Sequence, residues 1–161
     1  MPQTLEAVLK ANPRKFQGVI PYEEFVLHPA FGKEVKNVGS YVLTLNDKLL
    51  RRQSSPQVEE MEIGLNTIII RRNGKTVTRT IPNRMKPFFD LLQAAILDRP
   101  LMADDALQHQ LQVIPTGWRA DITLRAKNKG MITFTGCGRV LHSIGLNLSK
   151  GQERTIRFRT Q

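Results

Sequence analysis

The chain has 161 residues, enough for one domain with a hydrophobic core over residues 1–161 and too few for two. Hydrophobic residues make up 40% and charged residues 24%, which argues against a disordered or fibrous chain, and the uncharged apolar runs at 65–70 and 91–97 are shorter than the roughly 20 residues of a transmembrane helix. Lys and Arg (24) outnumber Asp and Glu (14), and the net charge of +10 favours anionic partners: nucleic acid, an anionic membrane surface or an acidic protein.

The first predicted element is a short helix over residues 4–10. Thr4 is a candidate N-cap, apolar residues follow at helical spacing, and Pro13 ends the pattern. The apolar period then changes to two, which predicts strands at 39–45, 48–53, 60–65, 68–72 and 75–81. Asn73-Gly74 between the last two is the strongest hairpin signal in the chain.

A second helix is predicted from residue 85 to residue 98, because apolar residues recur there at steps of three and four. Pro87 fits its first turn and Pro100 lies beyond its end. A short helix is plausible at 103–107. Alternation then predicts further strands at 110–113, 118–125, 131–135, 140–148 and 155–159.

The sum is a mainly β (α+β) fold with about nine to eleven antiparallel strands, joined by short connections. A sheet of this length must curl or close, otherwise an apolar face stays exposed, and the helices are the obvious cover. We expect the alternating apolar residues to face a common interior, among them Val77, Ile81, Ala120, Ile156 and Phe158. Alternation alone leaves open whether that interior is packed or hollow.

No catalytic or metal-binding pattern emerges, so we predict no enzyme activity, no metal and no cofactor. The three histidines (His28, His109 and His142) and the single Cys137 lack metal-ligand spacing. Adjacent carboxylates such as Glu23-Glu24 and Glu59-Glu60 would point to opposite faces of a strand. Trp118, at the start of an alternating strand, favours a core role over ligand stacking.

Basic residues come in pairs spread along the chain rather than on one helix. We interpret them mainly as solvated strand faces, because no nucleic-acid-binding motif accompanies them, and we expect no nucleic-acid partner. The pairs are Arg14-Lys15, Arg51-Arg52, Arg71-Arg72 and Arg157 with Arg159.

The order of elements over residues 5–158 resembles the LolA-like lipoprotein carriers. The similarity is most telling at 38–43 (VGSYVL) and 49–56 (LLRRQSSP), which resemble that family's glycine-bearing strand and the next strand, which closes on proline. Later matches are Ile81-Pro82 before the second helix, Trp118 with its strand, and the terminal strand at 151–158.

The resemblance implies an unclosed, curved antiparallel β-barrel whose concave apolar face is covered by helices and receives the acyl chain of a lipoprotein or lipid. It implies a monomeric periplasmic carrier between an inner-membrane exporter and an outer-membrane acceptor, and a chain that begins after a removed leader. The predicted cavity and lid residues are Tyr41, Leu43, Leu45, Met61, Ile63, Leu65, Phe88, Leu91, Leu92, Ile96, Trp118, Ile122, Leu124, Ile144 and Leu146.

Lipoprotein-sorting carriers have a basic residue just before a proline near the end of the glycine-bearing strand, where this chain has Leu45-Asn46. A different lipid or acyl ligand therefore stays open as the cargo. Two other functions also stay open: an envelope interaction or sensor module that uses the same curved sheet without transport, and a basic nucleic-acid-binding domain.

Overall fold

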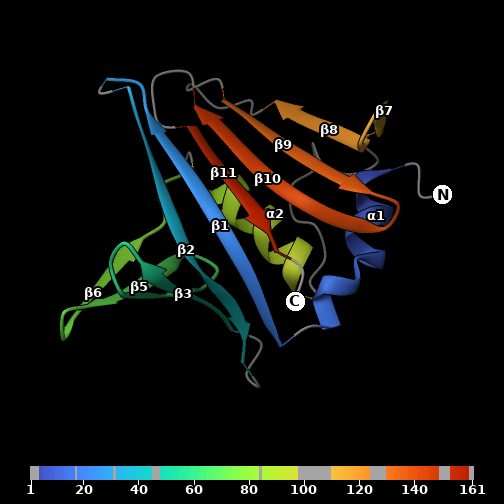
Figure 1. Ribbon diagram of the computed structural model, residues 1–161. Helices are drawn as coiled ribbons and strands as arrows, with labels where there is room; N and C mark the ends of the chain where they lie inside the picture. The colour runs from blue at the N-terminus through green and yellow to red at the C-terminus, as the bar shows by residue number, and fades with distance from the viewer. Residues whose placement is uncertain are drawn as a thin grey trace.

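The computed structural model describes residues 4–16, 18–30, 32–44, 48–83, 85–97, 110–123, 130–148 and 153–159. Its dominant feature is one antiparallel sheet of eleven strands, strongly curved, with the helices on its concave side (Figure 1). The strands are β1 (Val19–His28), β2 (Lys33–Leu43), β3 (Leu49–Ser55), β4 (Glu59–Ile63), β5 (Thr67–Arg72), β6 (Lys75–Thr80), β7 (Gln112–Ile114), β8 (Gly117–Thr123), β9 (Gly130–Cys137), β10 (Val140–Leu148) and β11 (Glu153–Phe158).

The strand order is β6-β5-β4-β3-β2-β1-β11-β10-β9-β8-β7. In the described residues only the β1 to β11 pairing joins strands distant in sequence, and it places the first and the last strand side by side at the centre of the sheet. In the described residues β6 and β7 are the two edges and do not pair with each other, so the barrel is unclosed. The predicted fold class and the upper end of the predicted strand number are confirmed.

The Asn73-Gly74 hairpin between β5 and β6 forms as predicted. Both residues have positive φ, 53° and 73°, the conformation that a two-residue turn of this kind requires. This hairpin projects beyond the helices, and every residue of β6 is exposed.

Helix α1 (Leu5–Ala11) begins as predicted: the Thr4 hydroxyl accepts a hydrogen bond from the Ala7 amide at 3.3 Å. A short 3-10 helix, η1 (Pro13–Phe16), follows. Helix α2 (Lys86–Ile96) has Pro87 in its first turn and ends two residues before the predicted boundary. The predicted helix at 103–107 lies outside the described residues. None of the helices in the described ranges is long and apolar enough to cross a bilayer.

The core lies between the concave face of the sheet and the two α-helices. Helix α2 is buried along the whole of its second half, from Leu91 to Ile96, because it lies between the sheet and the N-terminal segment. Two expected interior residues lie elsewhere. Leu65 is 61% exposed because β4 ends at Ile63 and the alternation stops with it. Val77 is on the concave face but 44% exposed, because β6 lies beyond the helical cover.

The N-terminal segment is fastened to the sheet and to α2 by two buried polar side chains. Asn12 donates from Nδ2 to the Ala95 carbonyl (3.1 Å) and accepts from the Leu141 amide (3.4 Å). Arg14 donates from Nε to the Leu141 carbonyl (2.7 Å) and from Nη1 to the Arg159 carbonyl (3.3 Å). The interpretation of Arg14 as a solvated residue is therefore wrong: its donors satisfy main-chain acceptors in the interior.

Gly39 makes a close approach of two strands possible. It lies at a β-bulge in β2, and a Cβ atom there would collide with the Arg52 carbonyl of β3 and come within 2.8 Å of the Tyr22 hydroxyl. The glycine in the 38–43 motif is thus required by packing at the bend of the sheet.

We expect Gly39→Ala to lower the free energy of unfolding by about 1–3 kcal/mol, because the added methyl group must displace main-chain atoms. Gly18→Ala is the matched control. A Cβ atom at Gly18 meets nothing within 4 Å, and its cost should stay within about 0.5 kcal/mol. Urea unfolding of both variants measures the difference, and equal losses would contradict this account.

Candidate functional site

A row of side chains crosses six strands on the concave face, and its members become steadily more exposed towards β6. The register places Ile20, Tyr41, Arg51, Met61, Ile70 and Val77 opposite one another in turn. The first two are at most 1% exposed, Arg51 is 7% exposed, Met61 and Ile70 are half-buried, and Val77 is 44% exposed. Beyond Arg51 the row is apolar again, and this outer part lies past α2 in an open surface strip. We call Met61, Ile70 and Val77 the outer strip.

A pocket of about 440 Å³ lies on the part of the sheet formed by β4, β5 and β6, which we call the wing. It is lined by Glu59, Ile70, Arg72, Asn73, Lys75, Val77 and Arg79. Its size lies within the range of roughly 300–1,000 Å³ that is common for small-ligand sites. Ile70 and Val77 form its apolar floor, and charged side chains surround them.

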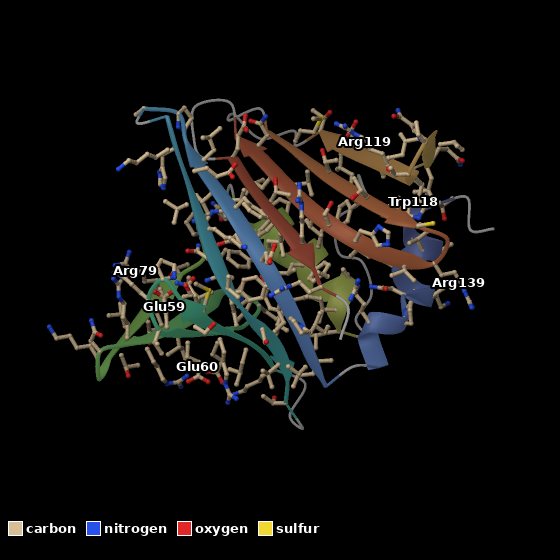
Figure 2. The ribbon with its side chains drawn as sticks, viewed as in Figure 1. Glu59, Glu60, Arg79, Trp118, Arg119 and Arg139 are labelled. Atoms are coloured by element: carbon tan, nitrogen blue, oxygen red, sulfur yellow. The ribbon has the colours of Figure 1, made fainter. Side chains whose placement is uncertain are left out.

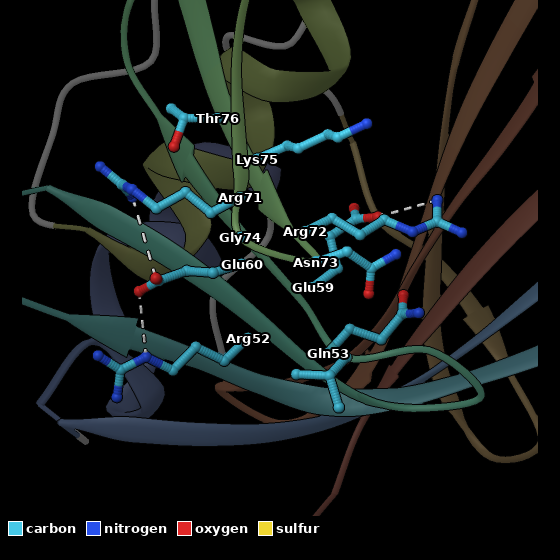
Figure 3. A pocket seen from close by; sticks show the side chains of 11 residues that line it. Arg52, Gln53, Glu59, Glu60, Arg71, Arg72, Asn73, Gly74, Lys75 and Thr76 are labelled. Carbon is cyan, nitrogen blue, oxygen red and sulfur yellow. Dashed lines mark hydrogen bonds and ion pairs between the residues drawn. The ribbon is translucent and has the colours of Figure 1, made fainter.

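The two faces of this wing differ in character. On the convex side Arg71 lies 3.9 Å from Glu60 and Arg52 lies 3.3 Å from the same carboxylate. On the concave side Arg72 approaches Glu59 at 3.9 Å. Figure 3 shows the two groups on opposite sides of the hairpin, and Figure 2 places Glu59 and Arg79 on the wing, far from Trp118. The prediction that Glu59 and Glu60 point to opposite faces is confirmed.

A buried ionic cluster interrupts the apolar face where β1, β2, β3 and β11 meet. Glu24 accepts from Arg51 Nη2 at 2.7 Å and from Asn37 Nδ2 at 2.9 Å, and Arg154 Nη1 lies 3.5 Å from its other oxygen. The side chains of Glu24 and Arg51 are only 3% and 9% exposed. Arg51 is therefore not the solvated residue that its pairing with Arg52 suggested, because β3 turns alternate residues to opposite faces.

Two tyrosines lie beside this cluster, with ring centroids 4.8 Å apart, and the Arg51 guanidinium lies 5.2 Å from the Tyr22 ring centroid. Burial raises the pKa of Tyr22 to about 12 and also raises the pKa of Tyr41, because the phenolate would be desolvated. The Tyr22 hydroxyl is buried and has no hydrogen-bond partner among the described residues.

Most of the predicted cavity residues belong to the buried hydrophobic core. Buried there are Tyr41, Ile63, Phe88, Leu91, Leu92, Ile96, Trp118, Ile122, Ile144 and Leu146. Leu43 and Met61 pack against this core and are half-buried, whereas Leu65 is exposed and does not join it. Leu45 and Leu124 lie outside the described residues. Contact of the predicted cavity residues with an acyl chain stays a prediction.

Trp118 fits its core prediction, since its indole is 4% exposed and its Nε1 donates to the Gly138 carbonyl at 3.0 Å. A Cβ atom at Gly136 would collide with the indole ring, so the position of Trp118 requires glycine at residue 136.

Alternation along the chain does not single out Ile70 or Glu24, nor does it show that Arg72 and Arg79 face inward. Ile70 is within the apolar run at 68–70, where a period of two cannot say which residue faces inward. The alternation Lys75-Val77-Arg79 was visible in the chain, but it is typical of any exposed edge strand. Among the described residues no group of three or more His, Cys, Asp and Glu side chains is placed to hold a metal ion.

No protein-family model matches this chain, and no curated protein matches it. Among solved structures it is similar to the crystal structure of LprF from Mycobacterium bovis, with a TM-score of 0.44 and 10% sequence identity. The likeness covers 96% of this chain and 91% of that chain. Membership of the LolA-like family stays a prediction.

We expect Glu24→Gln to lower the free energy of unfolding by about 3–5 kcal/mol, because it leaves the buried Arg51 without its counter-charge. Adding Arg51→Met should restore most of the loss, since both charges are then gone. Glu23→Gln, on the same strand but the opposite face, should cost less than about 1 kcal/mol. Denaturant unfolding of these three variants and of Arg51→Met alone tests this, and a double variant as unstable as the sum of its two singles would contradict a coupled pair.

We expect Tyr22→Phe to raise the free energy of unfolding by about 1 kcal/mol, because it removes a buried hydroxyl that lacks a partner. Folding raises the pKa of Tyr22 from 10.0 to about 12, so its ionisation does not lower the free energy of unfolding well below pH 10.0 and lowers it as the pH rises towards about 12. The decline of stability over that interval should therefore be shallower in Tyr22→Phe. Denaturant unfolding between these pH values measures both effects, and a destabilised variant would show that the hydroxyl is paired.

Proposed function

We propose that this protein is a non-enzymatic carrier that shelters the apolar part of a lipid or other amphiphile on the concave face of its sheet. The observation that supports this most directly is the outer strip. Monomeric proteins bury such a surface or use it. Here it begins at Met61, which packs against the core, and its Ile70 and Val77 form the floor of a pocket.

The energetics suit reversible holding of a hydrocarbon chain. Each methylene group removed from water contributes about 0.8 kcal/mol, so a chain lying on the strip and covered by its neighbours binds without covalent chemistry. Because the pocket is open to solvent beside an edge strand, the ligand can enter and leave while α2 stays in place.

The finer proposal is that the cargo is an acyl chain of a lipoprotein or lipid. According to this proposal the protein acts as a monomer in the periplasm, takes the cargo from an inner-membrane exporter and delivers it to an outer-membrane acceptor. This part rests on the resemblance of the chain to the LolA-like carriers and on the open, helix-covered sheet that such a carrier requires.

The proposal predicts that Ile70→Asp lowers the affinity for the neutral fluorescent probe N-phenylnaphthylamine by about tenfold or more, because a carboxylate replaces the floor of the pocket. Ile69→Asp is the matched control: the residue precedes Ile70 on β5, is also half-buried and points to the convex face.

Fluorescence titration gives the affinities, and thermal unfolding shows whether both variants keep the fold. Failure of the wild-type protein to bind the probe would refute the proposal. Equal effects of the two substitutions would move the site away from the concave face.

A further inference from the structure

Cations flank the outer strip where it reaches the edge of the sheet. On β6 the side chains of Lys75, Val77 and Arg79 share the concave face, and Val77 ends the row that begins in the core. Arg72 is paired with Lys75 across the hairpin. An apolar groove therefore opens between two positive groups that lie about 7 Å along the strand on either side of Val77.

These cations are poorly neutralised by the protein. Glu59 is the only carboxylate lining the pocket, and it lies 3.9 Å from Arg72. Among the described residues no carboxylate lies within 4 Å of Lys75 or Arg79. On the convex face of the same hairpin, in contrast, Arg71 lies between Glu60 and Glu62. The unbalanced positive charge is thus concentrated on the face that carries the apolar floor.

From this arrangement we propose that the outer strip takes an anionic amphiphile. The hydrocarbon chain lies from Val77 across Ile70 to Met61, and the phosphate or carboxylate headgroup lies at the edge strand between Lys75 and Arg79, beside Arg72. This inference rests on the proposed function and adds a headgroup class to it. Phosphate and carboxylate amphiphiles share the feature that this site would recognise, a single anionic group at the end of an apolar chain.

The layout favours an amphiphile over a free anion. Lys75 and Arg79 are exposed side chains, and because exposed charge contacts are individually weak they would hold a free small anion only weakly. A chain anchored on the floor between them supplies the affinity, and the cations then discriminate among headgroups.

The test compares three single-chain ligands of equal chain length, each below its micelle-forming concentration: dodecyl phosphate, dodecylphosphocholine and dodecyl maltoside. Displacement of N-phenylnaphthylamine measures their affinities. We expect dodecyl phosphate to bind about tenfold more tightly than dodecyl maltoside, with dodecylphosphocholine close to the maltoside. Rising salt should reduce this preference, because the contacts are exposed.

Two sets of variants test which side chains cause the preference for dodecyl phosphate. Lys75→Gln combined with Arg79→Gln, and separately Arg72→Gln, should remove most of this preference, measured as the ratio of the affinities for dodecyl phosphate and dodecyl maltoside. Arg71→Gln is the matched control: the side chain is 43% exposed against 44% for Arg72, lies one residue away and faces the convex side. It should keep the preference.

The outcomes separate this inference from the proposed function. Equal binding of the three ligands overturns the headgroup inference but agrees with the proposed carrier function. No binding of any ligand or of the probe overturns both. A loss in Arg71→Gln equal to that in Arg72→Gln shows a general charge effect and overturns the site. Competition by inorganic phosphate as strong as that by dodecyl phosphate shows a free-anion site and overturns the amphiphile.

Discussion

The apolar concave face of an open sheet is larger than the helices that cover it. Helix α2 is buried against the sheet and supports one wall of the core, and α1 and η1 contact both α2 and β10. The sheet nevertheless extends through β4 and β5 to β6, where this cover ends and the side chains of the same row become exposed (Figure 1). Water contact with this apolar surface is unfavourable, and a hydrocarbon ligand would relieve it.

The attachment of α2 bears on how such a ligand would enter. Its C-terminal half is held from one side by Asn12, which donates to the Ala95 carbonyl, and from the other by Gln93, which donates to the Gly64 carbonyl at 3.2 Å. These bonds join the N-terminal segment, the helix and the β4 end into one body. Access to the outer strip then comes from the open edge at β6 and does not require α2 to leave the sheet.

The ionic cluster around Glu24 sets the inner limit of the strip. Arg51 stands in the same row as Met61 and is held by Glu24, so the apolar path ends at a fixed charge before it reaches Tyr41. Burying these ions costs desolvation energy that their mutual attraction only partly offsets. The same cluster fixes β1, β3 and β11 relative to one another, because Glu24 contacts a residue of each neighbouring element.

Local periodicity, caps and turn residues predicted the two α-helices, the hairpin at Asn73-Gly74 and every strand of the described sheet except β1, because no predicted strand covers residues 19–28. The sequence also placed Glu59 and Glu60 on opposite faces, which follows from the strand period alone. Tertiary structure decided that Arg14 and Arg51 are buried, that Leu65 and Val77 are exposed, and that Arg72, Lys75 and Arg79 surround an apolar floor. Those outcomes depend on how far α2 extends over the sheet and on which residues of each strand the strand pairing places on the concave face. A single sequence holds no local signal for distances between residues so far apart in the chain.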